Sequence, residues 1–185
     1  MTFQELNTFK NSEFKVGASI FKRLFWYFLN ALVFNSYLFP FYGLKRSLLR
    51  LFGARIGRSV VVKPKVNIKY PWKLVIGNYS WIGEKVWIDN LDLVDIGANV
   101  CVSQGALILS GNHNFKKKSF DLLTKPIIIE EGAWIGAKSV VTQGIVIPKN
   151  SVLTVASVAS NNMEEAAIYR GNPAVKVSKR ILDED

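Results

Sequence analysis

The only histidine of this 185-residue chain, His113, stands in a polar turn, Gly111-Asn112-His113-Asn114. An imidazole titrates near neutrality, so it can remove a proton from a hydroxyl or an amine as a general base. Asp121, later in the same stretch, could hold the ring in one tautomer or bind a substrate hydroxyl. It could equally be a solvated loop carboxylate, and the sequence leaves these alternatives open. The pattern favours proton-transfer chemistry around His113.

Other common kinds of site are not supported by the residues present. One histidine and one cysteine supply too few ligands for a closed zinc site, so we expect no metal. The chain has neither a Gly-x-x-x-x-Gly-Lys-Ser/Thr loop nor a Gly-x-Gly-x-x-Gly fingerprint for nucleotide phosphates. Cys101 lies between two valines, where a packed residue is favoured over a reactive one. A single cysteine also fits a reducing compartment such as the cytoplasm.

The net charge of +10 is unevenly distributed along the chain. Residues 1–75 contain thirteen Lys and Arg and two Glu, which gives 13 − 2 = +11. The remaining residues contain eleven basic and twelve acidic side chains, which gives 11 − 12 = −1. A basic N-terminal part fits an anionic membrane surface or a polyanionic substrate, with a solvated basic face as the alternative. No recognised nucleic-acid-binding motif accompanies the charge, so we expect no nucleic acid partner.

A six-residue repeat between Ile56 and Ala159 predicts the elements that position His113. Aliphatic residues recur at this spacing, in groups of three, three, three and six, at Ile56, Val62, Ile68, Ile76, Ile82, Ile88, Ile96, Val102, Ile108, Ile129, Ile135, Val141, Ile147, Leu153 and Ala159. A compact residue follows many of them four positions later, at Val60, Val66, Ser80, Val86, Val100, Ala106, Ala133, Ser139, Ser151 and Ser157. Neither a helical nor an alternating period gives this pattern.

Hexads of this kind predict a parallel β-helix over residues 56–160. Each hexad is a short strand with a tight turn, and three hexads close a triangular coil of about eighteen residues. The aliphatic residue points inward, and the residue that follows, often Gly or Asn, is expected to turn the corner, in places with positive φ. Stacked coils bury one continuous column of aliphatic side chains. His113 lies in the long break at 109–128, where we expect functional residues.

The flanking segments complete a three-part organisation. Residues 1–55 form an N-terminal arm and a hydrophobic, basic helical segment, and residues 161–185 form a C-terminal tail with a short helix. The apolar run within 21–44 is interrupted by Asn30, Asn35 and Ser36 and is stopped by Pro40, so it is short for a spanning helix. It also lacks the features of a signal peptide. We expect a helix packed on a neighbouring surface, with an interfacial membrane contact or a spanning helix as alternatives.

A second short helix is predicted over residues 45–52. Its apolar side chains can share one face, and Gly53 is expected to end it.

Several motifs resemble the hexapeptide-repeat acyltransferases. They are Ser110-Gly-Asn-His113, Pro126-Ile-Ile-Ile-Glu-Glu-Gly-Ala-Trp-Ile-Gly136 and Arg170-Gly-Asn-Pro-Ala174. Leu48-Leu-Arg-Leu-Phe-Gly-Ala-Arg-Ile-Gly57, Lys63-Pro-Lys-Val-Asn-Ile-Lys-Tyr-Pro-Trp72, Trp81-Ile-Gly-Glu84 and Val86-Trp-Ile-Asp-Asn-Leu91 are similar to the colanic-acid-biosynthesis branch. The resemblance covers residues from about 45 to 180. It implies a left-handed β-helix and a homotrimer with its sites between neighbouring subunits. It also implies direct transfer of acetyl from acetyl-CoA, with His113 as general base and backbone N–H groups near the loop stabilising the oxyanion.

The resemblance also assigns binding residues. Near the acceptor it places Asp89, Asn90, Asn112 and Asp121. Along the coil edge that would hold the coenzyme it places Trp134, Gly136, Ala137, Ser139, Val155, Ser160 and Asn161. Relatives commonly carry Thr-Lys-Asp where this chain has Ser160-Asn161-Asn162, and prolines where it has Glu164 and Glu165. Basic residues of the tail could supply charge to the coenzyme phosphates instead, namely Lys176, Lys179 and Arg180.

The predicted function is therefore an acetyl-CoA-dependent O-acetyltransferase. It would act on a sugar hydroxyl, in a sugar or lipid-linked saccharide, during surface polysaccharide synthesis. An amino-sugar N-acetyltransferase is one alternative, because the same base would serve an amine. A non-catalytic trimeric scaffold that docks at the membrane through residues 21–50 is another. The predicted location is the cytoplasm, peripheral at the inner face of the cell membrane.

Overall fold

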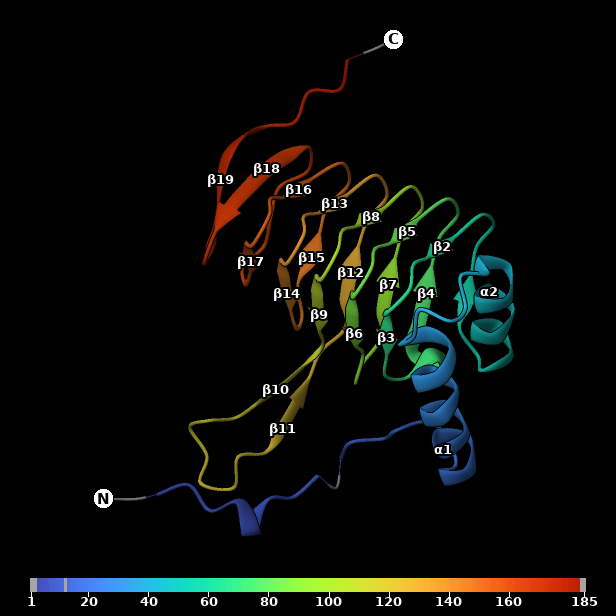
Figure 1. Cartoon of the computed structure of the whole chain (residues 1–185). Helices are drawn as coiled ribbons and strands as arrows, with labels where there is room; N and C mark the ends of the chain where they lie inside the picture. The colour runs from blue at the N-terminus through green and yellow to red at the C-terminus, as the bar shows by residue number, and fades with distance from the viewer. Residues whose placement is uncertain (1–2, 12, 184–185) are drawn as a thin grey trace.

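The body of the molecule is a three-sided solenoid (Figure 1), described here from a computed structural model that covers residues 3–11 and 13–183. Successive strands join three different parallel sheets in turn, with orders β1-β4-β7-β12-β15, β2-β5-β8-β13-β16-β18-β19 and β3-β6-β9-β14-β17. The final pair, β18 and β19, is the antiparallel exception in the second sheet. This arrangement confirms the parallel β-helix predicted from the hexads.

The elements have the following bounds. The solenoid strands are β1 (Arg55–Ile56), β2 (Val61–Val62), β3 (Asn67–Ile68), β4 (Leu74–Ile76), β5 (Trp81–Ile82), β6 (Trp87–Asp89), β7 (Val94–Ile96), β8 (Cys101–Val102), β9 (Leu107–Leu109), β12 (Ile127–Ile129), β13 (Trp134–Ile135), β14 (Val140–Thr142), β15 (Val146–Ile147), β16 (Val152–Leu153) and β17 (Val158–Ala159). The helical elements are η1 (Leu6–Thr8), α1 (Ile20–Leu29), the π-helical η2 (Asn30–Phe34), α2 (Tyr42–Leu51) and η3 (Pro71–Lys73).

The repeat positions form the core, as predicted. Ile56, at the open end of the first coil, is 8% exposed, and the other fourteen aliphatic hexad residues are at most 1% exposed. The ten compact residues are at most 2% exposed. Burying an aliphatic side chain contributes roughly 1.5–3 kcal/mol, so this single column supplies much of the driving force for folding.

The corners differ from the prediction in place and only partly in residue type. Positive φ falls on the residue immediately before the compact one. That residue is Gly or Asn, as expected, at some corners, including Asn99 and Gly105, and another type at others, including Lys65 and Tyr79. Such a left-handed residue costs roughly 1–2 kcal/mol, which the hydrogen bonds and core of the stacked coils offset. The glycine after the aliphatic residue instead allows coils to approach each other. A Cβ on Gly77 would lie 2.5 Å from the backbone N of Ala98 in the next coil.

The N-terminal helices cover the open end of the solenoid. Four side chains donate hydrogen bonds to carbonyl groups of the first coil: Trp26 Nε1 to Ile68 (2.8 Å), Lys45 Nζ to Lys63 (3.2 Å), Arg46 Nη1 to Val60 (2.9 Å) and Arg50 Nη2 to Ile56 (2.8 Å). A sheet edge otherwise leaves such groups unpaired. The expectation that this segment packs on a neighbouring surface is confirmed for its inner face, where Trp26 and Phe34 are buried.

The helix boundaries differ from the single segment predicted over 21–44. The Ser19 side chain caps α1 by accepting from the Lys22 N–H, and the helix passes into η2 before ending at Phe34. The second helix, α2, begins three residues earlier than predicted and ends before Gly53, which has a φ of +99°. No helix among the described residues is long and apolar enough to cross a bilayer.

The break in the repeat is a projecting hairpin (Figure 1). Strands β10 (Gly111–His113) and β11 (Leu122–Thr124) pair antiparallel and extend away from the prism. The N-terminal arm lies along this hairpin, because the Glu5 N–H donates to the Lys118 carbonyl at 2.9 Å and the two side chains form an ion pair. The N-terminal arm therefore supports the loop that carries His113.

The C-terminal tail corrects another expectation. It forms strands β18 (Ala167–Gly171) and β19 (Ala174–Lys179) where a short helix was predicted. β18 joins β16 in parallel, and β19 folds back on β18 as an antiparallel edge strand. The last coil offers an unpaired strand edge, and pairing with it outweighs the weak helical tendency of a short basic segment. Val175 and Val177 also favour a strand.

Candidate active site

His113 ends β10 and is held in one orientation by its own loop. Its Nδ1 lies 2.9 Å from the Phe120 carbonyl oxygen, and its ring stacks on that of Phe120 with centroids 4.3 Å apart. A carbonyl oxygen only accepts hydrogen bonds, so Nδ1 must carry the hydrogen of the neutral ring. Nε2 is then left with the lone pair that can accept a proton. This is the protonation pattern required of a general base.

Asp121 does not contact His113 by any hydrogen bond in the described part of the chain. Its Oδ2 lies 2.8 Å from Lys117 Nζ. Hydrogen bonds from Lys117, and then from Ser119, hold the pKa of Asp121 below its ordinary value. The tautomer of His113 is therefore set by a main-chain carbonyl. Asp121 also lines a hollow of about 760 Å³ between the hairpin and the N-terminal arm, so its predicted role with a substrate hydroxyl stays a prediction.

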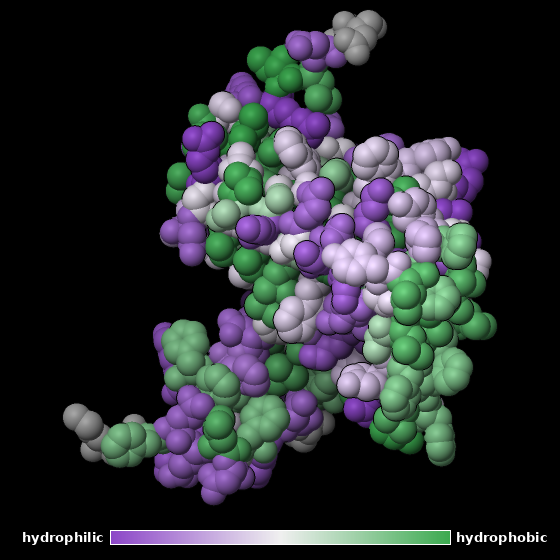
Figure 2. Space-filling view, viewed as in Figure 1, coloured by the Kyte–Doolittle hydropathy of each residue, from purple (hydrophilic) through white to green (hydrophobic). Residues whose placement is uncertain are grey.

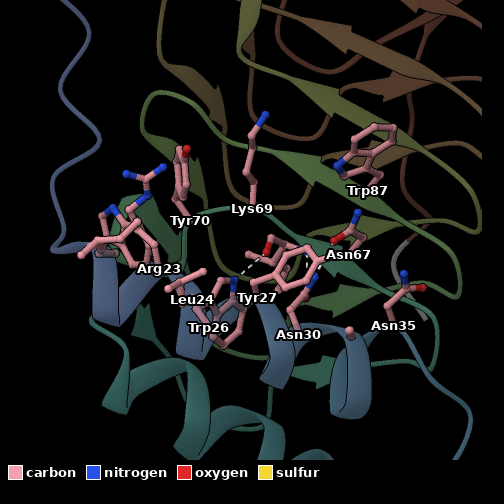
Figure 3. A pocket seen from close by; sticks show the side chains of 14 residues that line it. Arg23, Leu24, Trp26, Tyr27, Asn30, Asn35, Asn67, Lys69, Tyr70 and Trp87 are labelled. Atoms are coloured by element: carbon pink, nitrogen blue, oxygen red, sulfur yellow. Dashed lines mark hydrogen bonds between the residues drawn. The ribbon is translucent and has the colours of Figure 1, made fainter.

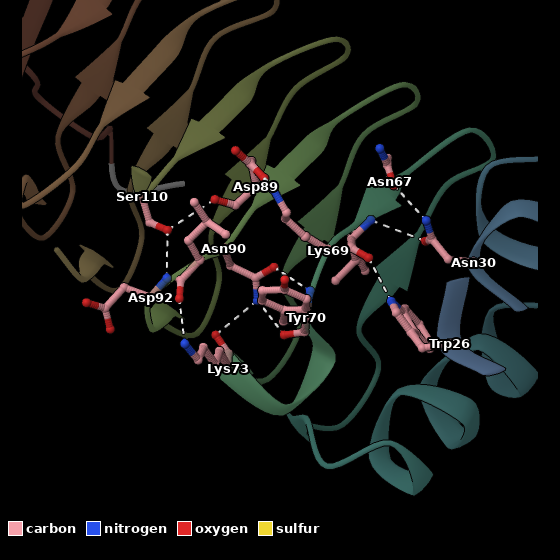
Figure 4. A network of polar contacts seen from close by, with 12 residues as sticks. Trp26, Asn30, Asn67, Lys69, Tyr70, Lys73, Asp89, Asn90, Asp92 and Ser110 are labelled. Carbon is pink, nitrogen blue, oxygen red and sulfur yellow. Dashed lines mark hydrogen bonds and ion pairs between the residues drawn. The ribbon is translucent and has the colours of Figure 1, made fainter. Parts of the chain in front are cut away.

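Asp89 presents a buried carboxylate beside the base of the hairpin (Figure 4). It ends β6 opposite Leu109 of β9, two residues before β10 begins, and it is 9% exposed. Lys69 Nζ lies 2.9 Å from Oδ1 as an ion pair, but no hydrogen bond of normal geometry reaches that oxygen. Lys69 therefore neutralises the carboxylate, and the predicted contact of Asp89 with the acceptor stays a prediction.

Asn90 and Asn112 have different surroundings. Asn90 is fully buried, and its amide accepts from the Tyr70 N–H at 2.9 Å and donates to the carbonyls of Tyr70 and Lys73 at 2.6 and 3.1 Å (Figure 4). These bonds use its hydrogen-bonding groups, so we assign it a structural role rather than the predicted acceptor contact. Asn112 is exposed, and its Oδ1 accepts from the backbone N–H of His113 at 2.8 Å.

A second hollow, which the sequence did not indicate, lies between α1 and the first two coils. It has a volume of about 490 Å³, with Arg23, Lys69, Tyr70 and Trp87 among its polar and aromatic lining (Figure 3). Lys69 connects it to Asp89. Aromatic faces and cations of this kind fit a sugar ring bearing a negative group. These residues lie far apart in the sequence, so only the spacing of the coils could have grouped them.

The predicted coenzyme residues fall into two sets. Trp134 (47% exposed), Val155 (64%), Ser160 and Asn161 are open to a ligand, and Ala137 is half-buried. Trp134 is fixed by a hydrogen bond from Nε1 to Ser103 Oγ of 2.9 Å. An extended, thin ligand could lie across these side chains.

The other predicted coenzyme residues are used by the protein itself. Gly136 packs against the next coil, where a Cβ would lie 2.6 Å from the Val155 N, and the buried Ser139 donates to the Thr154 carbonyl at 2.7 Å. Arg180 donates to the Gly132 carbonyl at 2.8 Å, and Lys176 pairs with Glu164 at 2.6 Å. The tail charges predicted for the coenzyme phosphates are therefore partly engaged.

Comparison with known proteins identifies the family. Over 181 residues the chain is 33% identical to the protein named "Putative colanic acid biosynthesis acetyltransferase WcaF" of Escherichia coli (strain K12), covering 98% of this chain and all of that protein. The chain belongs to the hexapeptide-repeat acetyltransferase family. Galactoside O-acetyltransferase of Lactococcus lactis is 26% identical over 147 residues, with 75% of this chain and 68% of that protein covered. No family model matches the chain.

Solved structures of hexapeptide-repeat acetyltransferases share the left-handed β-helix. The acetyltransferase VCA0836 of Vibrio cholerae, complexed with acetyl coenzyme A, superposes with a TM-score of 0.80 at 21% identity, covering 94% of this chain and 96% of that one. A galactoside acetyltransferase in complex with coenzyme A gives a TM-score of 0.75 at 24% identity, covering 85% of this chain and 80% of that one. At these identities the likeness establishes the fold.

Proposed function

We propose that this hexapeptide-repeat acetyltransferase moves acetyl from acetyl-CoA to a sugar hydroxyl during surface polysaccharide synthesis. The observation that carries the proposal is the orientation of His113, whose Nδ1–H donates to the Phe120 carbonyl and leaves Nε2 free. The whole-length relationship to WcaF, named for colanic acid biosynthesis, supports a polysaccharide precursor as the acceptor.

In the proposed reaction the acceptor oxygen attacks the thioester carbonyl while Nε2 of His113 takes the hydroxyl proton. The carbon–sulfur bond breaks, the proton passes to the leaving sulfur, and the products are an acetyl ester and free coenzyme A. No covalent intermediate on the protein is required, so Cys101, half-buried beside Ser103, has no part in the transfer. Asp89 would accept a hydrogen bond from a neighbouring acceptor hydroxyl.

The residues of the coil edge fit a coenzyme of this shape. Trp134, Ala137 and Val155 would contact the thin pantetheine arm, and Ser160 and Asn161 would lie farther along it. Arg180 is bonded to the Gly132 carbonyl, so we assign it to holding the tail. Lys179 is left for the phosphates, and Lys176 would have to exchange its ion pair with Glu164 for a phosphate. The relatives crystallised with acetyl-CoA or coenzyme A support this donor.

We also propose a homotrimer with its sites between subunits, acting at the inner face of the cell membrane. The hairpin projects from the prism, so His113 is presented away from its own coils, and Trp81, Trp87 and Trp134 are exposed on the prism walls. Exposed aromatic residues are enriched where subunits meet.

An assay of coenzyme A release with His113→Ala tests the proposal. Acetyl-CoA at 100 times its dissociation constant should stabilise both wild type and variant by about 2.7 kcal/mol in thermal unfolding. Turnover with a sugar acceptor should fall by about 10²–10⁴-fold in the variant only. Lys116→Ala, at an exposed position of the same loop, is the matched control and should keep wild-type activity.

The alternatives give different results in the same assay. If only amino-sugar acceptors are acetylated, the result would establish N-acetyl transfer instead. Absence of any thermal shift at millimolar acetyl-CoA would remove the enzyme proposal and favour a scaffold.

A further inference from the structure

The outer face of α1 and η2 is largely uncovered by the described residues, although Phe25 stacks on Phe52 with ring centroids 5.8 Å apart and Leu24 borders the hollow beside the coils. Lys22, Trp26 and Val33 face the first coil and are buried or half-buried. On the opposite side, the apolar residues are between 50% and 80% exposed, namely Phe21, Leu24, Phe25, Phe28 and Leu32. A helix that is apolar on all sides is normally buried on all sides. We call these five side chains the outer face.

The apolar surface extends beyond α1 across the helical end of the molecule (Figure 2). Leu38, Phe41 and Leu51, from the α1–α2 connection and from α2, are each more than 60% exposed. Single exposed apolar residues are normal, but a continuous patch of this kind marks a contact surface.

The charge around the outer face is predominantly positive, and Glu84, which accepts a hydrogen bond from the Tyr37 hydroxyl at 2.6 Å, is an acidic residue at its edge. Between Glu13 and Glu84 the sequence has twelve Lys and Arg and no Asp or Glu. Arg55 and Arg58 are exposed in the first coil, beside the helices. Among the described residues, no ion pair involves any residue from 14 to 68, so these cations are not neutralised by the chain itself. The surface therefore combines large apolar side chains with uncompensated positive charge.

We propose that the outer face of α1 inserts into the surface of an anionic bilayer. Together α1 and η2 span fifteen residues, roughly 22 Å, which is shorter than the roughly 30 Å of a hydrocarbon core. The helix therefore lies in the plane of the surface, with its aromatic side chains at the headgroup boundary. Arg55 and Arg58 meet the anionic headgroups.

Charge complementarity favours a bilayer over a second copy of the chain. Two copies joined through the same face would bring two predominantly positive surfaces together, with Glu84 only at the edge of each. An anionic leaflet supplies the opposite charge. The inference does not depend on acetyl transfer, since it concerns the helical end of the molecule and none of the residues proposed for catalysis.

Flotation of the full chain with lipid vesicles tests the inference. We expect binding to vesicles of equal parts phosphatidylglycerol and phosphatidylcholine, weakened by salt, and little binding to phosphatidylcholine alone. Phe21→Ser/Phe25→Ser/Phe28→Ser should lower the affinity at least about tenfold. Arg55→Gln/Arg58→Gln should lower it about fivefold for each charge removed.

A matched control removes exposed apolar residues at the other end of the molecule. Val175→Ser/Ile181→Ser/Leu182→Ser should bind vesicles like wild type. Circular dichroism and turnover with a free sugar acceptor verify that the phenylalanine variant is folded. Equal flotation of wild type and phenylalanine variant, or no flotation of wild type, would overturn the inference. A smaller oligomer for that variant in light scattering would assign the face to contacts between copies instead.

Discussion

At the scale of single residues, the structure gives His113 a main-chain partner. The Phe120 carbonyl oxygen accepts from Nδ1–H and so selects the neutral tautomer whose lone pair is on Nε2. The orientation of the proposed base is therefore set by the backbone of the loop, which the N-terminal arm supports through Glu5 and Lys118.

Two asparagines that the family resemblance treats alike should respond differently to mutation. Asn90→Ala leaves the Tyr70 N–H and the carbonyls of Tyr70 and Lys73 without their partner in a buried site, so it should lower the free energy of unfolding by at least about 2 kcal/mol. Asn112→Ala, at an exposed position, should change it by less than about 0.5 kcal/mol while reducing turnover. Urea unfolding and coenzyme A release measure the two effects. Equal stability of both variants would contradict the structural role of Asn90.

The roles of these asparagines could not be predicted from the sequence. An asparagine after a strand can contact a ligand or a distant loop, and the choice for Asn90 depends on η3, seventeen to twenty positions away. The same is true of Arg180, whose partner Gly132 belongs to another coil. His113 was accessible to prediction because its residue type is unique in the chain and its place breaks the repeat.

At the scale of elements, α2 stabilises the first coil through a buried cation. Lys45 is fully buried, and its Nζ contacts the carbonyls of Val62 and Lys63 without a carboxylate. Burial lowers the pKa of Lys45 below the ordinary 10.5. Between the folded and unfolded pKa values the unfolded chain binds more protons, so this residue makes stability rise with pH on the alkaline side.

Lys45→Met should remove that pH dependence. We expect the free energy of unfolding of wild type, relative to the variant, to increase as the pH rises through the lowered folded-state pKa toward the ordinary 10.5, because the wild type then loses the cost of a buried charge. Urea unfolding at several pH values measures the difference. Lys149→Met, at an exposed site, is the control. Parallel stability curves for wild type and Lys45→Met would contradict the assignment.

Elements also differ in how far the sequence predicts them. Each aliphatic hexad residue, such as Ile82 or Val102, can be buried only if it points into the prism. The six-residue period therefore determines where each strand of a coil lies. The tail has no such period, and whether residues 174–179 become a helix or a strand depends on the free edge of β18 beside them. The apolar character of the helical segment before Ile56 could be predicted from the sequence. Its contacts with carbonyl groups of the first coil could not, because they depend on the three-dimensional position of that coil.

At the scale of the whole molecule, the proposed trimer predicts complementation between inactive subunits. Three chains of 20.8 kDa give 3 × 20.8 = 62.4 kDa, which light scattering can verify. If each site takes His113 from one subunit and Asp89 from the next, His113→Ala and Asp89→Ala chains will rescue each other when co-expressed. Every mixed ring then contains one intact site of three. Random mixing in equal amounts should restore about a quarter of wild-type activity.

The two variants alone set the background for this measurement. Each should be inactive as a homotrimer, because every site lacks either the base or the acceptor carboxylate. Mixing the purified trimers without subunit exchange is the control and should restore nothing. An inactive co-expressed mixture with confirmed mixed trimers would show that His113 and Asp89 act within one chain. The β6–β9 register already places Asp89 beside Leu109 of its own hairpin base, so this result would assign the acceptor site to a single subunit and leave the trimer a structural role.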